Sequence, residues 1–127
     1  IVTAFDEEDS EALVAMFSDR ARENYDIEGQ IEAALEYYNG KSINRVDKLT
    51  CCDRTSAHIK DGSYKYKTIN FVLLNMETDT GEEYSIDVYY VLVDEEEPSR
   101  IGLSQIFFRD PEDNVGFELV IGAKLKD

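Results

Sequence analysis

The single histidine limits what chemistry this 127-residue sequence could perform. A Ser-His-Asp or Cys-His arrangement would have to use His58, which lies between Ala57 and Ile59 in a stretch with the composition of a strand. Catalytic zinc usually requires two or three histidines or several thiolates, and the sequence has no such cluster. We therefore expect His58 to be an exposed or structural residue, and we expect no metal site.

The two cysteines, Cys51 and Cys52, are adjacent. A disulfide between neighbours is strained, because ordinary bridges join Cα atoms about 5–6 Å apart. We expect two free thiols on a strand, with a strained redox pair or an intermolecular bridge as the alternatives. No C-x-x-C motif is present, so the usual redox template does not apply.

Acidic runs at 6–9, 94–97 and 110–114 offer oxygen ligands, but none follows the twelve-residue calcium loop with its glycine and final glutamate. The seven glycines form neither a G-x-G-x-x-G motif nor a phosphate-binding loop. We expect these acidic runs to be solvated surface. The sequence predicts no bound cofactor and no catalytic residue.

The formal net charge of −15 argues against nucleic acid or an anionic membrane as a partner. The charge is uneven: residues 1–40 carry −9, residues 41–76 carry +4 and residues 77–127 carry −10. Within the basic part, segment 64–67 alternates tyrosine and lysine, as a strand that stacks on single-stranded nucleic acid would. We favour an ordinary strand with one apolar and one solvated face.

The first forty residues show the 3.6-residue periodicity of helices. One face of the first clear helix holds Ala12, Leu13, Met16 and Phe17. One face of the second holds Ile27, Ile31, Ala34, Leu35 and Tyr38. Asp9 or Asp6 is expected to cap the first helix and Asp26 the second, which should end at Asn39-Gly40. Residues 1–5 are expected to belong to an earlier helix that begins before this chain.

From Lys41 onward the periodicity changes to two, which predicts strands. The expected strands are 64–77, 82–93, 100–109 and 115–122, with weaker ones at 42–50 and 54–60. A four-residue turn at 78–81 would pair residue 77 with 82 and align three apolar pairs: Leu73 with Ile86, Phe71 with Val88, and Ile69 with Tyr90. The predicted fold is α+β in one domain, 1–127: helices over about 1–40 pack on one face of a curved antiparallel sheet over about 41–122.

The orientation of strand 82–93 decides whether the predicted sheet offers a reactive carboxylate. We favour the alternative in which Tyr84, Ile86 and Val88 face the helices and Asp87 faces solvent. In the other alternative Asp87 is buried, its pKa is raised, and it acts as a base or donor. Gln105, expected to share a face with Leu103 and Phe107, is the second polar candidate. The candidate pocket lining is Phe17, Tyr38, Phe71, Tyr90, Gln105 and Phe107.

Three short motifs carry a resemblance to a known family: Phe17-Ser18 ending an early helix, Tyr38-Asn39-Gly40-Lys41 ending a later one, and Ile101-Gly102-Leu103 opening a strand. With them the sequence resembles an uncharacterised family of small lipoproteins from Firmicutes, which are Gram-positive bacteria. The order of elements resembles the nuclear-transport-factor-two-like fold of the cystatin-like group, in which a bent sheet closes a cone over its helices. The resemblance implies a secreted, lipid-anchored precursor whose signal and anchor cysteine are absent from this chain.

We therefore expect an extracytoplasmic, non-enzymatic domain that binds a small molecule or a protein partner through the cone or a sheet face. The alternative is an isomerase- or hydratase-like enzyme that uses Asp87 or Gln105 with a tyrosine, as enzymes of the wider fold use Asp/His/Tyr sets. The membrane would be reached only through the lipid anchor. A homodimer through the outer sheet face is a further possibility, because that face is apolar: Val72, Leu74, Tyr89, Val91 and Val93.

Overall fold

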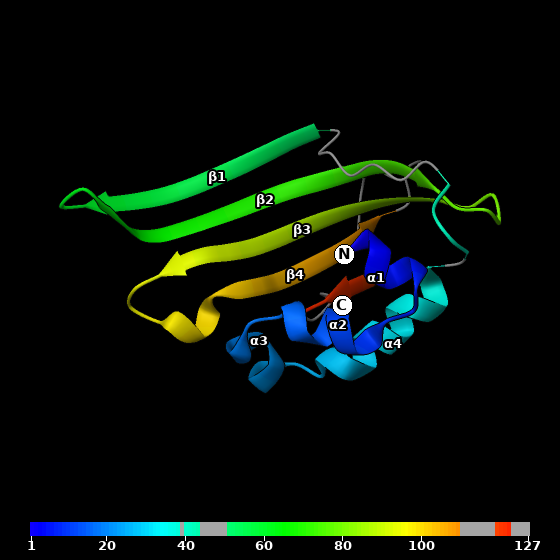
Figure 1. Cartoon of the computed structure of the whole chain (residues 1–127), viewed down its shortest axis with the longest axis horizontal. Helices are drawn as coiled ribbons and strands as arrows, with labels where there is room; N and C mark the ends of the chain where they lie inside the picture. The colour runs from blue at the N-terminus through cyan, green and yellow to red at the C-terminus, as the bar shows by residue number, and fades with distance from the viewer. Residues whose placement is uncertain (39, 44–50, 110–118, 123–127) are drawn as a thin grey trace.

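The computed structural model describes residues 1–38, 40–43, 51–109 and 119–122, without the side chains of 51–54 and 73–76. Helices come first and antiparallel strands follow, so the predicted α+β order is confirmed (Figure 1). The described elements are α1 (Val2–Asp6), α2 (Ser10–Met16), α3 (Asp19–Asn24), α4 (Ile27–Tyr37), β1 (Cys51–Lys60), β2 (Ser63–Glu77), β3 (Glu83–Asp94), the 3₁₀ turn η1 (Pro98–Arg100), β4 (Gly102–Arg109) and β5 (Leu119–Ile121).

Side-chain caps start three of the helices. Asp9 accepts a hydrogen bond from the Ala12 amide and Asp26 accepts one from the Gly29 amide, so both predicted caps are confirmed. Ser18 caps α3, a short helix that periodicity did not separate from its neighbours. None of the helices in the described ranges is long and apolar enough to cross a membrane.

The predicted strands 54–60, 64–77, 82–93 and 100–109 correspond to β1, β2, β3 and β4 with ends that differ by up to three residues, whereas the described part of 42–50 holds only an isolated bridge at Ser42. Helix α4 ends at Tyr37, and Gly40 has a left-handed φ of +91°. Of the predicted stop, Asn39 lies outside the described residues, as do positions 44–50 and 115–118 of two predicted strands. Consecutive strands pair antiparallel in the order β1-β2-β3-β4-β5.

The register between β2 and β3 is the predicted one over its central part. Leu73 pairs with Ile86, Phe71 with Val88, and Ile69 with Tyr90. The prediction is wrong at the turn, where residue 77 pairs with 83 and not with 82. The amide of residue 78 donates to the carbonyl of residue 82, which makes the turn one residue longer. A register shift between 73 and 76 compensates for that extra residue and restores the apolar pairs.

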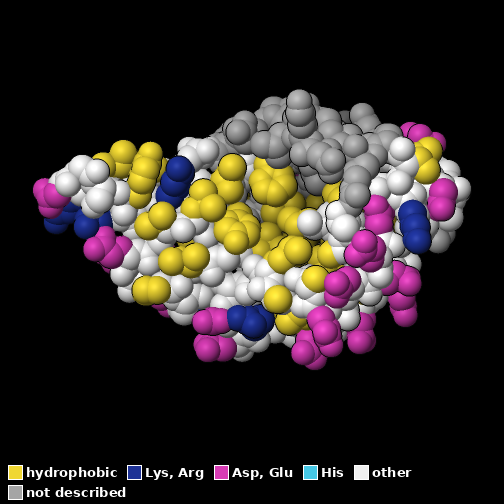
Figure 2. Space-filling model, in the orientation of Figure 1, with side chains coloured by type: hydrophobic (Ala, Val, Ile, Leu, Met, Phe, Trp, Pro, Cys, Tyr) yellow, Lys and Arg dark blue, Asp and Glu magenta, His cyan; other side chains and the backbone are white. Residues whose placement is uncertain are grey.

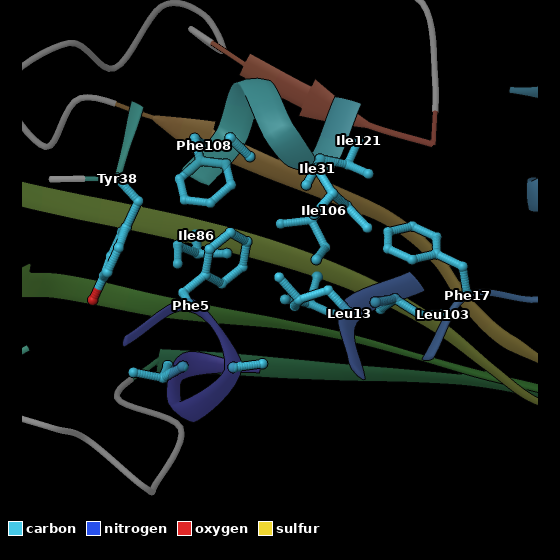
Figure 3. Packing of buried hydrophobic residues seen from close by; sticks show 14 of the residues in the cluster. Phe5, Leu13, Phe17, Ile31, Tyr38, Ile86, Leu103, Ile106, Phe108 and Ile121 are labelled. Carbon is cyan, nitrogen blue, oxygen red and sulfur yellow. The ribbon is translucent and has the colours of Figure 1, made fainter. Parts of the chain in front are cut away.

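The main core lies between the helices and one face of β3, β4 and β5 (Figure 3). Phe108 of β4 is fully buried and meets Phe5 edge-on, with 5.3 Å between ring centroids. Burying a side chain of this size stabilises the fold by about 1.5–3 kcal/mol. The largest fully buried residues of the core are Phe5, Phe17, Phe108, Leu13, Ile31, Ile86, Leu103, Ile106, Ile121 and Val88.

The helices cover only part of the sheet. Helix α4 contacts β5 and helix α3 contacts η1, whereas the β1–β2 hairpin projects beyond the helices in Figure 1. On the sheet face opposite the helices, Val72 pairs with Asp87 and Thr68 with Val91. A register shift lies between Lys67 and Thr68, and beyond it Val93 pairs with Lys67. The prediction that Val93 lies on the outer apolar face is therefore wrong.

Candidate functional site

Two of the three sequence motifs meet in space at the start of β4. The Ser18 amide donates a 2.9 Å hydrogen bond to the Leu103 carbonyl, and Phe17 forms an isolated parallel bridge with Leu103. Gly102 allows this close approach, because it has a φ of +128° and a β-carbon there would lie 3.0 Å from the Ser18 nitrogen. The junction therefore brings α3 against the start of β4.

Gly122, just after β5, makes a second close approach. A β-carbon at this position would lie 2.1 Å from the Ser104 carbonyl oxygen, and the residue has a φ of +86°. The Gly122 amide donates a 2.8 Å hydrogen bond to the Gln30 side chain of α4. Helix α4, strand β4 and the end of β5 are therefore held together at one corner of the fold.

A polar cavity of about 250 Å³ opens at this corner, and we call it the arginine cavity. Among the described residues, its lining includes two arginines, three residues with hydroxyl groups and two with carboxamides, and it includes no aspartate or glutamate. In a chain of net charge −15, a donor-rich cavity of this kind differs from the average surface. The lining residues are Ser18, Arg20, Ala21, Asn24, Tyr25, Arg100, Ser104, Gln105 and Gly122.

Acids outside the lining hold the two arginines in place. Arg20 forms an ion pair with Glu97, and the Arg100 Nε lies 3.7 Å from a Glu97 oxygen. Arg100 also lies 3.9 Å from Asp94, whose side chain is only 7% exposed and accepts the Glu97 amide at 3.0 Å. Each guanidinium carries five N–H donors, more than these contacts use. The two cations therefore keep donors available for a ligand.

A second, larger cavity of about 630 Å³ is also lined by Arg100. Its lining mixes charges of both signs and includes the single histidine, which is exposed. We find no group of three or more His, Cys, Asp and Glu side chains arranged for a metal ion within the described ranges. The residues lining this cavity are His58, Lys65, Tyr66, Asp94, Glu96, Glu97 and Arg100.

The six predicted pocket residues do not gather around one cavity. Phe17 and Tyr38 are buried in the core, where Figure 3 labels both. Phe71 and Tyr90 are half-buried and pack against the edge of that core. Only Gln105 lines the arginine cavity.

Phe107 contacts Tyr89 on the sheet face opposite the helices, with ring centroids 6.1 Å apart. The expectation that Gln105 and Phe107 share a face with Leu103 is wrong. Gln105 pairs with Tyr89 but Leu103 pairs with Tyr90, so Ser104 is an extra residue on β4 that changes the face.

Asp87 faces away from the helices, as the favoured alternative predicted, because its neighbours Ile86 and Val88 are both buried in the core. It is nevertheless not in open solvent: its side chain is 14% exposed and lies 3.0 Å from the Arg109 guanidinium. Burial raises the pKa of Asp87, and the positive charge of Arg109 opposes that shift. Asp87 is therefore a paired carboxylate outside the arginine cavity.

Sequence analysis did not predict a polar cluster around Asp6. Its carboxylate accepts hydrogen bonds from the Tyr38 hydroxyl at 3.0 Å, from the Ser42 amide at 2.9 Å and from the Ser42 hydroxyl. Burial and the Asp6 charge raise the pKa of Tyr38 above its ordinary value, so this phenol stays a neutral donor at physiological pH. The cluster ties α1 to the chain that follows α4.

One local feature of the sequence points to the arginine cavity: the spacing of Glu97 and Arg100. Arg100 follows Glu97 by three residues across Pro98, a spacing that lets the two side chains meet on one helical turn. The expectation that the run 94–97 is solvated surface is wrong at Asp94, which is only 5% exposed. Arg20 carried no comparable signal, because its partner Glu97 is distant in sequence.

Residues 1–117 match a protein family described as a domain of unknown function (DUF5104), and the chain belongs to this family. No curated protein matches the chain.

Proposed function

We propose that this member of the DUF5104 family is a non-enzymatic binding domain that holds a small organic anion in the arginine cavity. The observation that carries the proposal is a lining with two arginines and, among the residues that the structure describes, no carboxylate, in a chain of net charge −15. A guanidinium recognises a carboxylate through two parallel N–H···O bonds, which are among the stronger hydrogen bonds of proteins. A carboxylate ligand is therefore the best match to these donors.

The size and polarity of the arginine cavity limit the ligand. Sites for drug-sized molecules span about 300–1,000 Å³ and are mostly apolar. The arginine cavity measures about 250 Å³ and is lined mainly by polar side chains. A short dicarboxylate, with one carboxylate for each guanidinium, suits both limits. Succinate is a suitable probe.

Nothing in the described residues favours the isomerase- or hydratase-like alternative. That alternative depends on Asp87 or Gln105 acting with a tyrosine in a pocket. Asp87 lies outside the arginine cavity and pairs with Arg109. Gln105 lines the cavity as a residue, but it pairs with Tyr89 on the face opposite the helices, and a carboxamide is a poor proton acceptor.

Succinate is expected to bind the wild-type chain in isothermal titration calorimetry at low salt, and to raise its melting temperature. Arg100→Gln should weaken binding about tenfold or more, because it removes a charge-assisted hydrogen bond worth about 1.5–3 kcal/mol. Arg22→Gln is the matched control, since Arg22 is similarly exposed (42% against 48% for Arg100), pairs with Asp19 and lies outside the lining of the arginine cavity. Equal affinities for the wild type and Arg100→Gln would contradict the proposal.

We further propose that the natural precursor is secreted and lipid-anchored, and that the sheet and helices form the cone of the nuclear-transport-factor-two-like fold. The resemblance of its motifs supports the first point, and helices on one face of a five-stranded antiparallel sheet are compatible with the second. The full-length precursor, produced in a Gram-positive host, should incorporate radiolabelled palmitate. A precursor that stays unlabelled in the cytoplasm would contradict this localisation.

A further inference from the structure

The β1–β2 hairpin carries a charge opposite to that of the rest of the chain. Residues 51–76 hold four bases and two acids, a net of +2, while residues 1–40 carry −9 and residues 77–127 carry −10. It also projects beyond the helices (Figure 1). Because charges are screened beyond about 8–10 Å at physiological salt, a short ligand at its end would meet mainly the local positive charge.

The hairpin also exposes apolar side chains and a strand edge. Every described side chain of β1, residues 55–60, is exposed. Ile59 is 58% exposed and Tyr64, which pairs with it, is 47% exposed. Figure 2 shows hydrophobic side chains at this end of the molecule with basic and a few acidic ones beside them, and acidic side chains gathered along the helices. Since β1 is first in the sheet order, no other described strand pairs with its outer edge.

Two lysines of the hairpin keep their charge available. Lys67 lies over the Tyr64 ring, with 4.7 Å between its Nζ and the ring centroid. Lys60 has no ion-pair partner in the part of the chain that the structure describes. Lys65 differs, because it pairs with Glu95 at 2.8 Å. Lys67 therefore lies on the same face as the apolar pair Ile59 and Tyr64, and Lys60 supplies positive charge on the opposite face of β1.

We propose that β1 binds an extended acidic segment of a partner protein as an additional strand. The backbone of the segment pairs with the open edge of β1, as in other cases of strand addition. Its carboxylates meet Lys60 on one face of β1, and its apolar side chains cover Ile59 on the other face, where Tyr64 and Lys67 of β2 lie one strand further from the edge. This inference uses a surface separate from the arginine cavity and stands independently of it.

The charges on β1 and on the rest of the surface argue against two other ligands for this edge, a second copy of the chain and nucleic acid. Antiparallel pairing of two β1 strands would bring His58 and Lys60 of one copy close to those of the other. Lysines on edge strands are a common device against such self-pairing. Nucleic acid extends past the hairpin and would meet the acidic remainder of the surface. A short acidic peptide segment avoids both conflicts.

The test uses a fluorescein-labelled peptide of about ten residues that alternates glutamate and valine, with lysine replacing glutamate in its control. Fluorescence anisotropy should show binding of the glutamate peptide alone, weakening as salt rises. The double variant Lys60→Glu with Lys67→Glu should lose about tenfold or more in affinity, because two attractions become repulsions. Lys41→Glu, exposed and outside the hairpin, should bind like the wild type.

Backbone methylation separates strand addition from simple charge attraction. In an added strand, alternate N–H groups point toward β1. Two glutamate peptides, N-methylated on the two alternate sets of residues, should therefore differ: one loses binding and the other keeps it. Equal binding of both methylated peptides would overturn strand addition. A dimer joined through β1, detected by light scattering and lost in the double variant, would overturn the choice of occupant.

Discussion

Replacing Gly122 with alanine is expected to lower the free energy of unfolding by about 4 kcal/mol or more, a loss at the extreme of point substitutions. The β-carbon would lie 2.1 Å from the Ser104 carbonyl oxygen, which is a backbone atom of β4. The φ of +86° adds about 1–2 kcal/mol for any residue with a β-carbon. Domains of this size have about 5–15 kcal/mol of stability in total, so the variant should be largely unfolded or close to it.

Gly81→Ala separates the steric clash from the backbone strain. Gly81 has nearly the same φ, +85°, but nothing lies within 4 Å of its virtual β-carbon. Its alanine variant should lose only the conformational part, and urea unfolding followed by circular dichroism would measure both variants. Similar midpoints for the two variants would show that β4 yields to the added methyl group, against the close approach described here.

Phe108→Ala is expected to lower the free energy of unfolding by about 3–5 kcal/mol. The ring is fully buried and makes edge contacts with Phe5 and Tyr37, at 5.3 Å and 5.7 Å between centroids. Truncation removes the buried area, both aromatic contacts and the packing around them, and it leaves a cavity. Helix α1 should lose protection from hydrogen exchange first, because Phe5 belongs to it.

Phe107→Ala is the matched control, one residue earlier on the same strand. Phe107 lies on the opposite face and is half-buried against Tyr89, so its truncation should cost clearly less. Chemical denaturation of the two variants compares the two faces of the sheet directly. A larger loss for Phe107→Ala than for Phe108→Ala would contradict the assignment of these faces.

Local patterns in the sequence were enough to predict the elements and most of the sheet. The cap residues Asp9 and Asp26 act within one turn of their helices, so their role depends on few distant contacts. The central register of β2 and β3 was predictable because a slip of one residue would expose Ile86 and Val88. The turn was predicted one residue too short, because its length depends on a compensating irregularity further along β2.

The face of Phe107 and Gln105 could not be predicted from alternation alone. A single extra residue, Ser104, changes the face between Leu103 and Gln105. Bulges of this kind depend on how the neighbouring strand twists and packs, which a two-residue period does not encode. The predicted pocket lining therefore combined side chains from both faces of the sheet.

The sequence by itself determined the α+β order, the helix caps, the strand pairs and the uneven charge, because each depends on neighbours in the chain or on composition. Only the tertiary structure decided that Arg20 and Arg100 share one acid, Glu97, and line one cavity. Arg20 and Glu97 are 77 positions apart, and their meeting depends on the close approach of Gly102 to Ser18. Contacts of that range arise from packing, where one bulge or one glycine sets which side chains meet.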